Sequence, residues 1–315
     1  MPMKGGAIMT ILNISQKLHI DKGIILTTKG SKYLLIRAIG FGKNNIVYYA
    51  LGVEGRQKGN FFAIKIQYNL EGKRVKRFFR EVSFLRQHQH PYAVRYYDEG
   101  YYQSENQTYP FVVISYLPYT LDDYITNFKV SFERKICFAC QMASALCWLK
   151  SLNTLHRDIK PLNIFTDGEK AVLGDFGLIK NLNKERLLIS EWDDSETEDI
   201  LNASDTMPRF YRTPELVRFA KKEDVLRVES DTFQMGLVYS NLFTGTNPLQ
   251  PSETKLDDLK IFFSEIDEGH VNYQIVKRIN CLIRKMLDMD YNMRATPEYV
   301  LQEIVAIYSI YAVYE

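Results

Sequence analysis

The sequence predicts an α+β protein with a small, strand-rich N-terminal part and a larger, mainly helical C-terminal part. Three short runs between residues 33 and 67 are rich in branched and aromatic residues and are bounded by glycine or asparagine: YLLIRAIG, IVYYALG and FFAIKIQ. This pattern is typical of β-strands. From about Thr120 onward, apolar residues recur at spacings of three and four, which indicates buried helices.

The rest of the strand-rich part contains one helix and two further strands. The basic stretch EGKRVKRFFREVSFLRQ is predicted to be helical, and strands follow near AVRYYDEGYY and FVVISYL. These elements make a small antiparallel sheet with one helix. Residues 1–30 show weak periodicity, so we expect an N-terminal extension that is partly a flexible arm.

The helical part begins with a capping signal, because Thr120 and Asp123 have the spacing of a capping box. The next helix carries an apolar stripe: Phe132, Ile136, Ala139, Ala143, Leu146 and Leu149. Residues 231–243 and 273–288 show the same period. The C-terminal stretch EIVAIYSIYAVYE is apolar for about a dozen residues, which is too short to span a bilayer. A packed terminal helix is expected there.

Composition limits the class of protein. A chain of 315 residues with 46% hydrophobic and 25% charged residues predicts a globular protein of one large domain or two lobes. A net charge of +2 does not favour nucleic acid or membrane as a partner. The N-terminus has no signal-peptide pattern. Cys137 and Cys140 form a lone C-x-x-C that disfavours zinc, so we expect free thiols in a reducing cytoplasm.

A glycine-rich turn is the first candidate for ligand binding. In IGFGKNNIVYYALG, the backbone amides of Gly40 and Gly42 can approach phosphate oxygens, although two glycines in a hairpin are more often only a turn. Lys65 lies within a predicted strand. It either faces solvent or points into a cleft, where Glu81 could be its counter-charge and the pair could hold the α- and β-phosphates of a nucleotide.

A second candidate is the charged stretch TLHRDIKPLNIFTD, which lies between apolar runs. The charges either make salt bridges on a turn, or Asp158 and Asn163 hold a proton and a metal ion for chemistry on a phosphate. Asp175 follows within twenty residues in the triplet DFG. Asp158 and Asp175 could instead be helix caps or members of loop ion pairs.

Taken in order, these motifs resemble the signature set of protein kinases. The motifs, spread over residues 33 to about 305, are GFGKNNIV, AIK, Glu81, HRDIKPLN, DFG, TPE at 213–215, SDTFQMGLVY with Asp231, and DMDYNMRAT with Arg294. The chain is similar to eukaryotic-like (Hanks-type) serine/threonine protein kinases. The resemblance implies a bilobal kinase fold at residues 31–315, with an N-lobe at 31–116, a C-lobe at 117–315, and an N-terminal extension at 1–30.

The resemblance also assigns roles to individual residues. Asp158 is expected to accept the proton of the attacking hydroxyl, and Lys160 to neutralise charge on the transferred phosphoryl group. Lys65 with Glu81 completes the catalytic set, and Asn163 and Asp175 are the expected Mg²⁺ ligands. The expected ATP-binding residues, with Ile114 as gatekeeper and 115–117 as hinge, are Gly40, Gly42, Val47, Ala63, Lys65, Ile114, Ser115, Tyr116, Leu117 and Phe165.

Three further residues have structural roles in the resemblance. His156 is expected to pack under Phe176, and Arg157 to receive an anion from the activation segment. Glu215 is expected to pair with Arg294.

The function implied is transfer of the γ-phosphate of ATP to protein serine or threonine, with autophosphorylation of the activation segment. Lys160 within HRDIKPLN resembles the serine/threonine kinases, because tyrosine kinases usually carry an Ala-Arg version of this loop. A nucleotide-binding pseudokinase acting as a scaffold or allosteric partner is the alternative. A small-molecule kinase is less favoured because TPE belongs to a peptide-docking surface. We expect a cytoplasmic protein with unidentified protein substrates, no nucleic-acid or membrane partner, and a transient homodimer for autophosphorylation in trans.

The chain departs from the family pattern in three places. Asn45 replaces the third glycine of the loop, Pro208 stands where many relatives have threonine (Thr206 is nearby), and the segment from Asp175 to Glu215 is long. Its acidic stretch, residues 191–205, holds seven acids and no base, whereas residues 73–80 hold five bases and no acid. We expect the acidic stretch to dock on this basic helix as an electrostatic switch, strengthened by phosphorylation at Ser195, Thr197, Ser204 or Thr206. Two solvated charge runs that never meet are the alternative.

Overall fold

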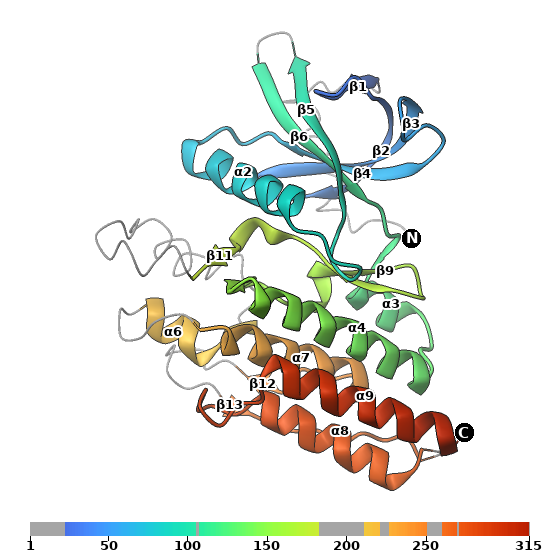
Figure 1. Ribbon diagram of the computed structural model, residues 1–315, viewed down its shortest axis with the longest axis vertical. Helices are drawn as coiled ribbons and strands as arrows, with labels where there is room; N and C mark the ends of the chain where they lie inside the picture. Colours follow the sequence, from blue (N-terminus) through green and yellow to red (C-terminus); the bar gives the residue numbers. More distant parts are fainter. Residues whose placement is uncertain are drawn as a thin grey trace. The chain divides into compact units, whose positions relative to one another are not determined.

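The computed structural model describes residues 23–104, 107–182, 211–220, 227–250, 260–269 and 271–314 (Figure 1). The chain divides into two compact units, residues 1–116 and residues 117–315. The first is a β-sheet with one helix and the second is mainly helical, which is the α+β organisation that the sequence predicts.

The first unit is built on a six-stranded antiparallel sheet. Its strands follow the order β1-β2-β3-β4-β6-β5. Five of them were predicted from the sequence and are confirmed: β2 (Lys32–Phe41), β3 (Asn45–Glu54), β4 (Phe61–Gln67), β5 (Tyr96–Ser104) and β6 (Gln107–Ser115). The predicted basic helix is α2 (Gly72–Gln87). One apolar cluster, which includes Tyr33, Ile64 and Phe111, forms the core of the sheet.

The sixth strand, β1 (Ile24–Leu26), differs from the expectation of an extension over residues 1–30. It pairs with β2, and Thr27 makes a β-bridge to Gly100 on β5, the strand at the other edge of the sheet. The Thr27 hydroxyl also donates a hydrogen bond to the buried Asp98 carboxylate at 2.8 Å. The sheet therefore begins before the predicted domain start at residue 31. Three residues are too few to show an alternating pattern, and the partners that hold them lie far away in the sequence.

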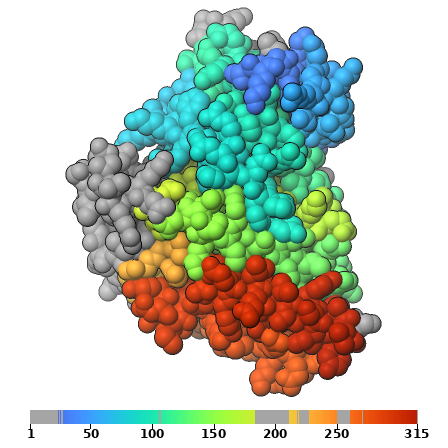
Figure 2. Space-filling model, viewed as in Figure 1, coloured from blue at the N-terminus to red at the C-terminus, as the bar shows by residue number. Residues whose placement is uncertain are grey.

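The second unit contains six helices among its described residues: α3 (Leu121–Asn127), α4 (Phe132–Ser151), α6 (Pro214–Ala220), α7 (Glu229–Thr244), α8 (Tyr273–Met286) and α9 (Pro297–Tyr314). The predicted cap is confirmed, because the Thr120 hydroxyl accepts a hydrogen bond from the Asp123 amide at 3.0 Å. The six residues of the predicted apolar stripe are all buried on α4. The C-terminal helix α9 packs along α4, and the surfaces of α8 and α9 adjoin in Figure 2.

Short strands surround the loops that carry the candidate catalytic residues. Strand β8 (Thr154–Leu155) pairs with β11 (Lys180–Asn181). A second sheet joins β7 (Tyr119–Thr120), β9 (Ile164–Thr166) and β10 (Ala171–Leu173). A third pair is β12 (Leu249–Gln250) with β13 (Lys260–Ile261). Residues 156–163 thus lie between two strands, and Asp175 follows the end of β10 after one residue, Gly174.

Among the described helices, none combines the length and apolar composition needed to cross a membrane. The acidic stretch at 191–205, its candidate phosphorylation sites and Pro208 lie outside the described residues.

Candidate active site

In the sheet unit, Lys65 on β4 meets Glu81 on α2. The Lys65 ammonium donates to both carboxylate oxygens of Glu81, at 2.9 and 2.8 Å. The side chains are only 9% and 4% exposed. A buried charge needs such a partner, because removing it from water is costly. The interpretation of Lys65 as a solvent-facing lysine is therefore excluded.

Several residues expected to bind ATP share one face of this sheet with Lys65. Val47 on β3 lies opposite Lys65, and Ala63, two residues before Lys65, lies opposite Ile114 on β6. Side chains of directly opposed residues, and of residues two apart on one strand, point to the same side. Val47, Ala63, Lys65 and Ile114 therefore line one surface.

The glycine turn between β2 and β3 is tight. The Gly42 amide, expected to approach a phosphate, donates instead to the Asn45 carbonyl at 2.9 Å. Asn45 is not among the described residues with positive φ, so the third glycine position needs no left-handed backbone here. A Cβ built on Gly40 or Gly42 would meet its nearest neighbours at 3.6 Å, an ordinary contact. Packing within the turn therefore does not require glycine at either position.

The predicted hinge residues divide between the two units. Ser115 ends β6, and its hydroxyl accepts a hydrogen bond from the Arg95 amide at 3.0 Å. The Tyr116 ring packs on Tyr49 with ring centroids 4.5 Å apart. Leu117 begins the helical unit, to which Phe165 on β9 also belongs.

In the helical unit, two candidate side chains, those of Lys160 and Asn163, contact the Asp158 carboxylate. The Lys160 ammonium donates to both of its oxygens, at 2.9 and 2.8 Å. The Asn163 amide nitrogen donates to Asp158 Oδ2 at 2.7 Å and to the Asp158 carbonyl at 2.8 Å. Burial raises the pKa of Asp158 to about 6, while the Lys160 ammonium acts in the opposite direction. Two side chains thus hold the carboxylate, and its pKa is high for an aspartate.

Asp175 has an unusual backbone conformation. Its φ is +56°, in the left-handed region, where a residue other than glycine costs roughly 1–3 kcal/mol. The amide of the preceding Gly174 donates to the Asn163 carbonyl at 2.8 Å. This bond joins the turn to residues 156–163, which we call the catalytic loop. Strained residues of this kind gather at functional sites.

Asn163 and Asp175 fit a magnesium ion by their donor chemistry. The two hydrogen bonds from Asn163 to Asp158 use only its amide nitrogen, which leaves its Oδ1 atom for a cation. Asp175 supplies carboxylate oxygens. Mg²⁺ prefers such oxygen ligands and is typically held by one or two protein groups plus waters and substrate phosphates. The described residues contain no cluster of three or more His, Cys, Asp or Glu suited to a metal.

His156 packs under Phe176, as the resemblance implies, with ring centroids 4.9 Å apart. Its Nδ1 atom accepts from the Asp158 amide at 3.3 Å, so Nε2 carries the proton and donates to the Gly174 carbonyl at 3.0 Å. Complete burial lowers the pKa of His156 to about 4. The neutral ring therefore ties the Asp158 backbone to the turn before Asp175.

The buried helix α7 fixes the start of the catalytic loop. Asp231 accepts hydrogen bonds from the amides of His156 at 2.7 Å and Arg157 at 2.9 Å. Arg157 has a φ of +69°, and its guanidinium donates to the Leu178 carbonyl at 2.5 Å. Its expected role as an anion receptor stays a prediction.

The predicted pair between Glu215 and Arg294 forms. The Arg294 guanidinium donates to Glu215 Oε1 at 2.8 Å, and neither side chain is exposed. One residue that contacts the catalytic loop, Gln234, was missed by sequence reasoning. Its only signal is a polar side chain in the apolar run of SDTFQMGLVY.

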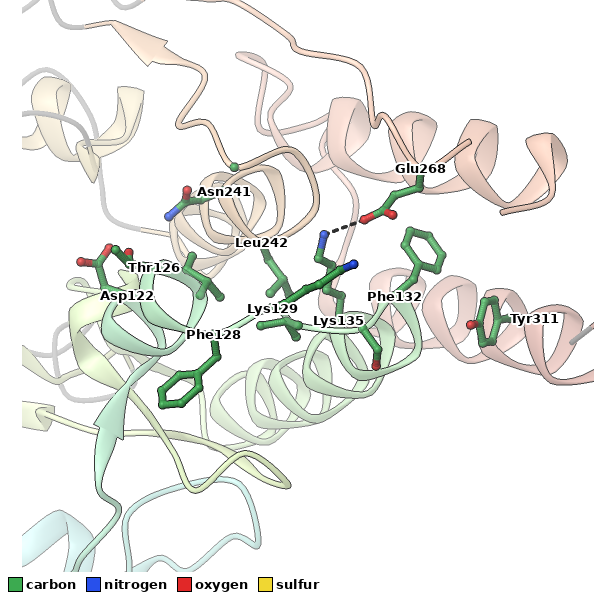
Figure 3. A pocket seen from close by; sticks show the side chains of 14 residues that line it. Asp122, Thr126, Phe128, Lys129, Phe132, Lys135, Asn241, Leu242, Glu268 and Tyr311 are labelled. Carbon is green, nitrogen blue, oxygen red and sulfur yellow. Dashed lines mark hydrogen bonds and ion pairs between the residues drawn. The ribbon is translucent and has the colours of Figure 1, made fainter. Parts of the chain in front are cut away.

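A separate pocket of about 710 Å³ lies in the helical unit (Figure 3). It lies among α3, the start of α4, the end of α7 and α9, and an ion pair of 2.8 Å between Lys135 and Glu268 forms part of its wall. None of the predicted site residues lines it.

The comparisons with known proteins show the family of this chain. The family model described as protein kinase domain matches residues 33–305, so the chain belongs to the protein kinase family. Among curated proteins, the chain is similar to a probable serine/threonine-protein kinase of Clostridium perfringens. The two are 25% identical over 268 residues, which cover 83% of this chain and 36% of the relative. The chain thus matches little more than a third of that protein.

Proposed function

We propose that this chain is an ATP- and Mg²⁺-dependent serine/threonine protein kinase that also phosphorylates its own activation segment. The observation that carries the proposal is the set of contacts at Asp158: Lys160 and Asn163 donate three short hydrogen bonds to its carboxylate, and Asn163 donates a fourth to its backbone carbonyl. In phosphoryl transfer the protein mainly positions the reactants and stabilises charge, and this cluster contains the groups for both tasks.

Asp158 is the group that orients the acceptor hydroxyl and takes its proton. Burial keeps its pKa near 6, closer to neutral pH than that of an exposed aspartate, and a general base works best when its pKa lies near the operating pH. Lys160 provides a positive charge beside this carboxylate, at the place where negative charge develops on the transferred group. His156 and Asp231 hold the backbone on which Asp158 stands.

The remaining residues bind the nucleotide. Lys65, oriented by Glu81, pairs with its phosphates, and the surface of Val47, Ala63 and Ile114 receives the adenine ring. When bound, Mg²⁺ would neutralise charge on the phosphates, and Asn163 and Asp175 would hold it.

Serine and threonine are the proposed acceptors. Lys160 in the catalytic loop supports this choice, as does the name of the Clostridium perfringens relative. We further propose a cytoplasmic location, which the exposed free thiol of Cys281 supports. The proposed partners are protein substrates and, transiently, a second copy of the chain for autophosphorylation in trans.

The test is to incubate the purified chain with labelled ATP and Mg²⁺, with and without dephosphorylated casein. The expected result is label on both proteins, with phosphate on serine or threonine after acid hydrolysis. The Asp158→Asn variant is the control that separates transfer by this site from a contaminating kinase. Nucleotide binding without any transfer would instead identify a pseudokinase, and phosphotyrosine alone would refute the acceptor class.

A further inference from the structure

Gln234 is a fully buried amide on a helix that is buried on all sides. It lies in the second turn of α7, where every residue from Ser230 to Ser240 is buried. A polar side chain in such a place is destabilising unless each of its groups finds a hydrogen-bond partner. The partners of Gln234 therefore indicate what the side chain does.

Among the described residues, Gln234 has three hydrogen-bond partners; all are backbone atoms, and two of them flank Asp158. Gln234 Oε1 accepts from the Ile159 amide at 2.9 Å, and Gln234 Nε2 donates to the Arg157 carbonyl at 3.1 Å. One side chain thus holds the peptide groups immediately before and after the candidate base.

The backbone at this point needs such support. Arg157 is in the left-handed region with a φ of +69°, and a strained residue of this kind persists only when its surroundings fix it. Asp231 fixes the amides of His156 and Arg157, but these lie on the N-terminal side of Asp158. Gln234 holds two further backbone groups: the carbonyl of Arg157 and, on the C-terminal side of Asp158, the amide of Ile159.

The third partner links this loop to a distant part of the chain. Gln234 Nε2 also donates to the Tyr211 carbonyl at 2.9 Å. Tyr211 lies shortly before the TPE motif and is itself buried. The Tyr211 backbone and the catalytic loop therefore share one amide nitrogen, that of Gln234.

We propose that Gln234 is a positioning residue that fixes Asp158 for proton transfer and couples its placement to Tyr211. The proposal rests on the function proposed above for Asp158. Both hydrogens of the Gln234 amide are used, one on Arg157 and one on Tyr211. A displacement of Tyr211 leaves a buried donor unsatisfied, and the side chain can regain a partner only by moving away from the Asp158 loop.

The test compares Gln234→Met with Thr232→Val. Methionine has nearly the volume of glutamine but cannot make these hydrogen bonds. Thr232 is equally buried on the same helix, and its hydroxyl has no hydrogen-bond partner among the described residues. Both changes replace a buried polar group by an apolar one of similar size, and only the first removes the contacts with the catalytic loop.

For Gln234→Met we expect kcat to fall by roughly 10–100-fold, because a displacement of about 1 Å in a catalytic group can cost about 10²-fold. KM for ATP should stay within about twofold, because among the described residues Gln234 makes its hydrogen bonds with Arg157, Ile159 and Tyr211 and not with a proposed nucleotide residue. Amide hydrogen exchange should accelerate at residues 156–160 and around Tyr211. Thr232→Val should leave all three measurements unchanged.

A purely structural role predicts a different result. It would lower the folded fraction and accelerate exchange throughout the unit, with normal kcat per folded molecule, and that outcome would overturn the proposal. If Gln234→Met does not fold, the shorter amide of Gln234→Asn replaces it, and a second failure to fold would likewise identify a structural residue. If the wild-type chain transfers no phosphate, the proposed function fails, and local exchange at residues 156–160 alone decides whether Gln234 holds the loop.

Discussion

A Glu215→Ala substitution would leave the Arg294 guanidinium buried without its carboxylate. The guanidinium keeps its hydrogen bonds to the carbonyls of Asp288 and Glu229, both at 2.9 Å, and its position over the Phe233 ring. It loses the contact with Glu215 at 2.8 Å, where neither side chain is exposed. The Ser230 hydroxyl, which donates to the second oxygen of Glu215 at 3.2 Å, loses its acceptor as well.

The expected loss follows from burial. Breaking a fully buried ion pair by removing one partner costs roughly 3–5 kcal/mol, because the remaining charge is uncompensated. In a unit of this size, 1 kcal/mol shifts the melting temperature by about 2–4 °C. The melting temperature of the helical unit should therefore fall by roughly 6–20 °C.

The assay is thermal unfolding followed by circular dichroism, with Glu265→Ala as the matched control. Glu265 contacts Arg284 at the same distance of 2.8 Å, but its side chain is 67% exposed and that of Arg284 is 49% exposed. An exposed pair contributes under about 1 kcal/mol, so the control should melt close to the wild type. The double variant Glu215→Ala/Arg294→Met should recover part of the loss, because it removes the uncompensated charge.

A melting temperature for Glu215→Ala equal to that of the control would refute the reasoning. The reasoning would also be refuted if adding Arg294→Met to Glu215→Ala lowered the stability by as much as Arg294→Met lowers it in the wild type. The effects of the two substitutions would then be independent.

The remaining predictions concern the catalytic groups. Asp158→Asn should lower phosphoryl transfer by ~10²–10⁴-fold with nucleotide binding retained, and a residual rate above about a hundredth of wild type would contradict its role as base. Asp175→Ala should weaken binding of Mg²⁺-ATP while binding of the nucleotide measured without the metal changes little, and equal losses in both titrations would argue against a metal ligand. Lys65→Met should raise KM for ATP, measured against a Glu81→Gln variant expected to show a smaller effect of the same kind. His156 remains neutral in the folded chain down to about pH 4, whereas it takes up a proton near pH 6.5 when unfolded. The neutral ring therefore contributes about 3 kcal/mol to the free energy of unfolding above pH 6.5, and this contribution is lost as the pH falls towards 4. Urea unfolding should show the free energy of unfolding decreasing over this pH range. The same decrease in His156→Leu would exclude His156 as its cause.

The sequence predicted the elements whose pattern is local. Helix α4 carries six apolar residues at regular spacing, and β4 is a run of branched and aromatic residues, so both were assigned from their own residues. Lys65 and Glu81 were paired correctly because a buried lysine requires a counter-charge and the next helix offered one. The motifs near Asp158 and Asp175 also stood out, since clustered charges between apolar runs are uncommon.

Other contacts could not be predicted because their partners lie far apart in the chain. Nothing near Gln234 in the sequence indicates that its amide meets Ile159 and Tyr211. The Gly42 amide was expected to face a phosphate, and its bond to the Asn45 carbonyl depends on how the turn closes. Docking of residues 191–205 on the basic helix stays a prediction, because that stretch lies outside the described residues.

The strand that precedes the predicted domain start has a consequence for the behaviour of shortened chains. With Ile24–Leu26 in place, the backbone groups along the first half of β2 are paired on both sides, and Thr27 reaches across to β5. A chain that begins at residue 31 would expose the outer backbone groups of Tyr33 and Leu34, which pair with β1 in the full sheet. An unprotected edge of this kind recruits strands from other molecules. Self-association of such a shortened chain would therefore reflect the lost strand, and should not be taken for the native assembly.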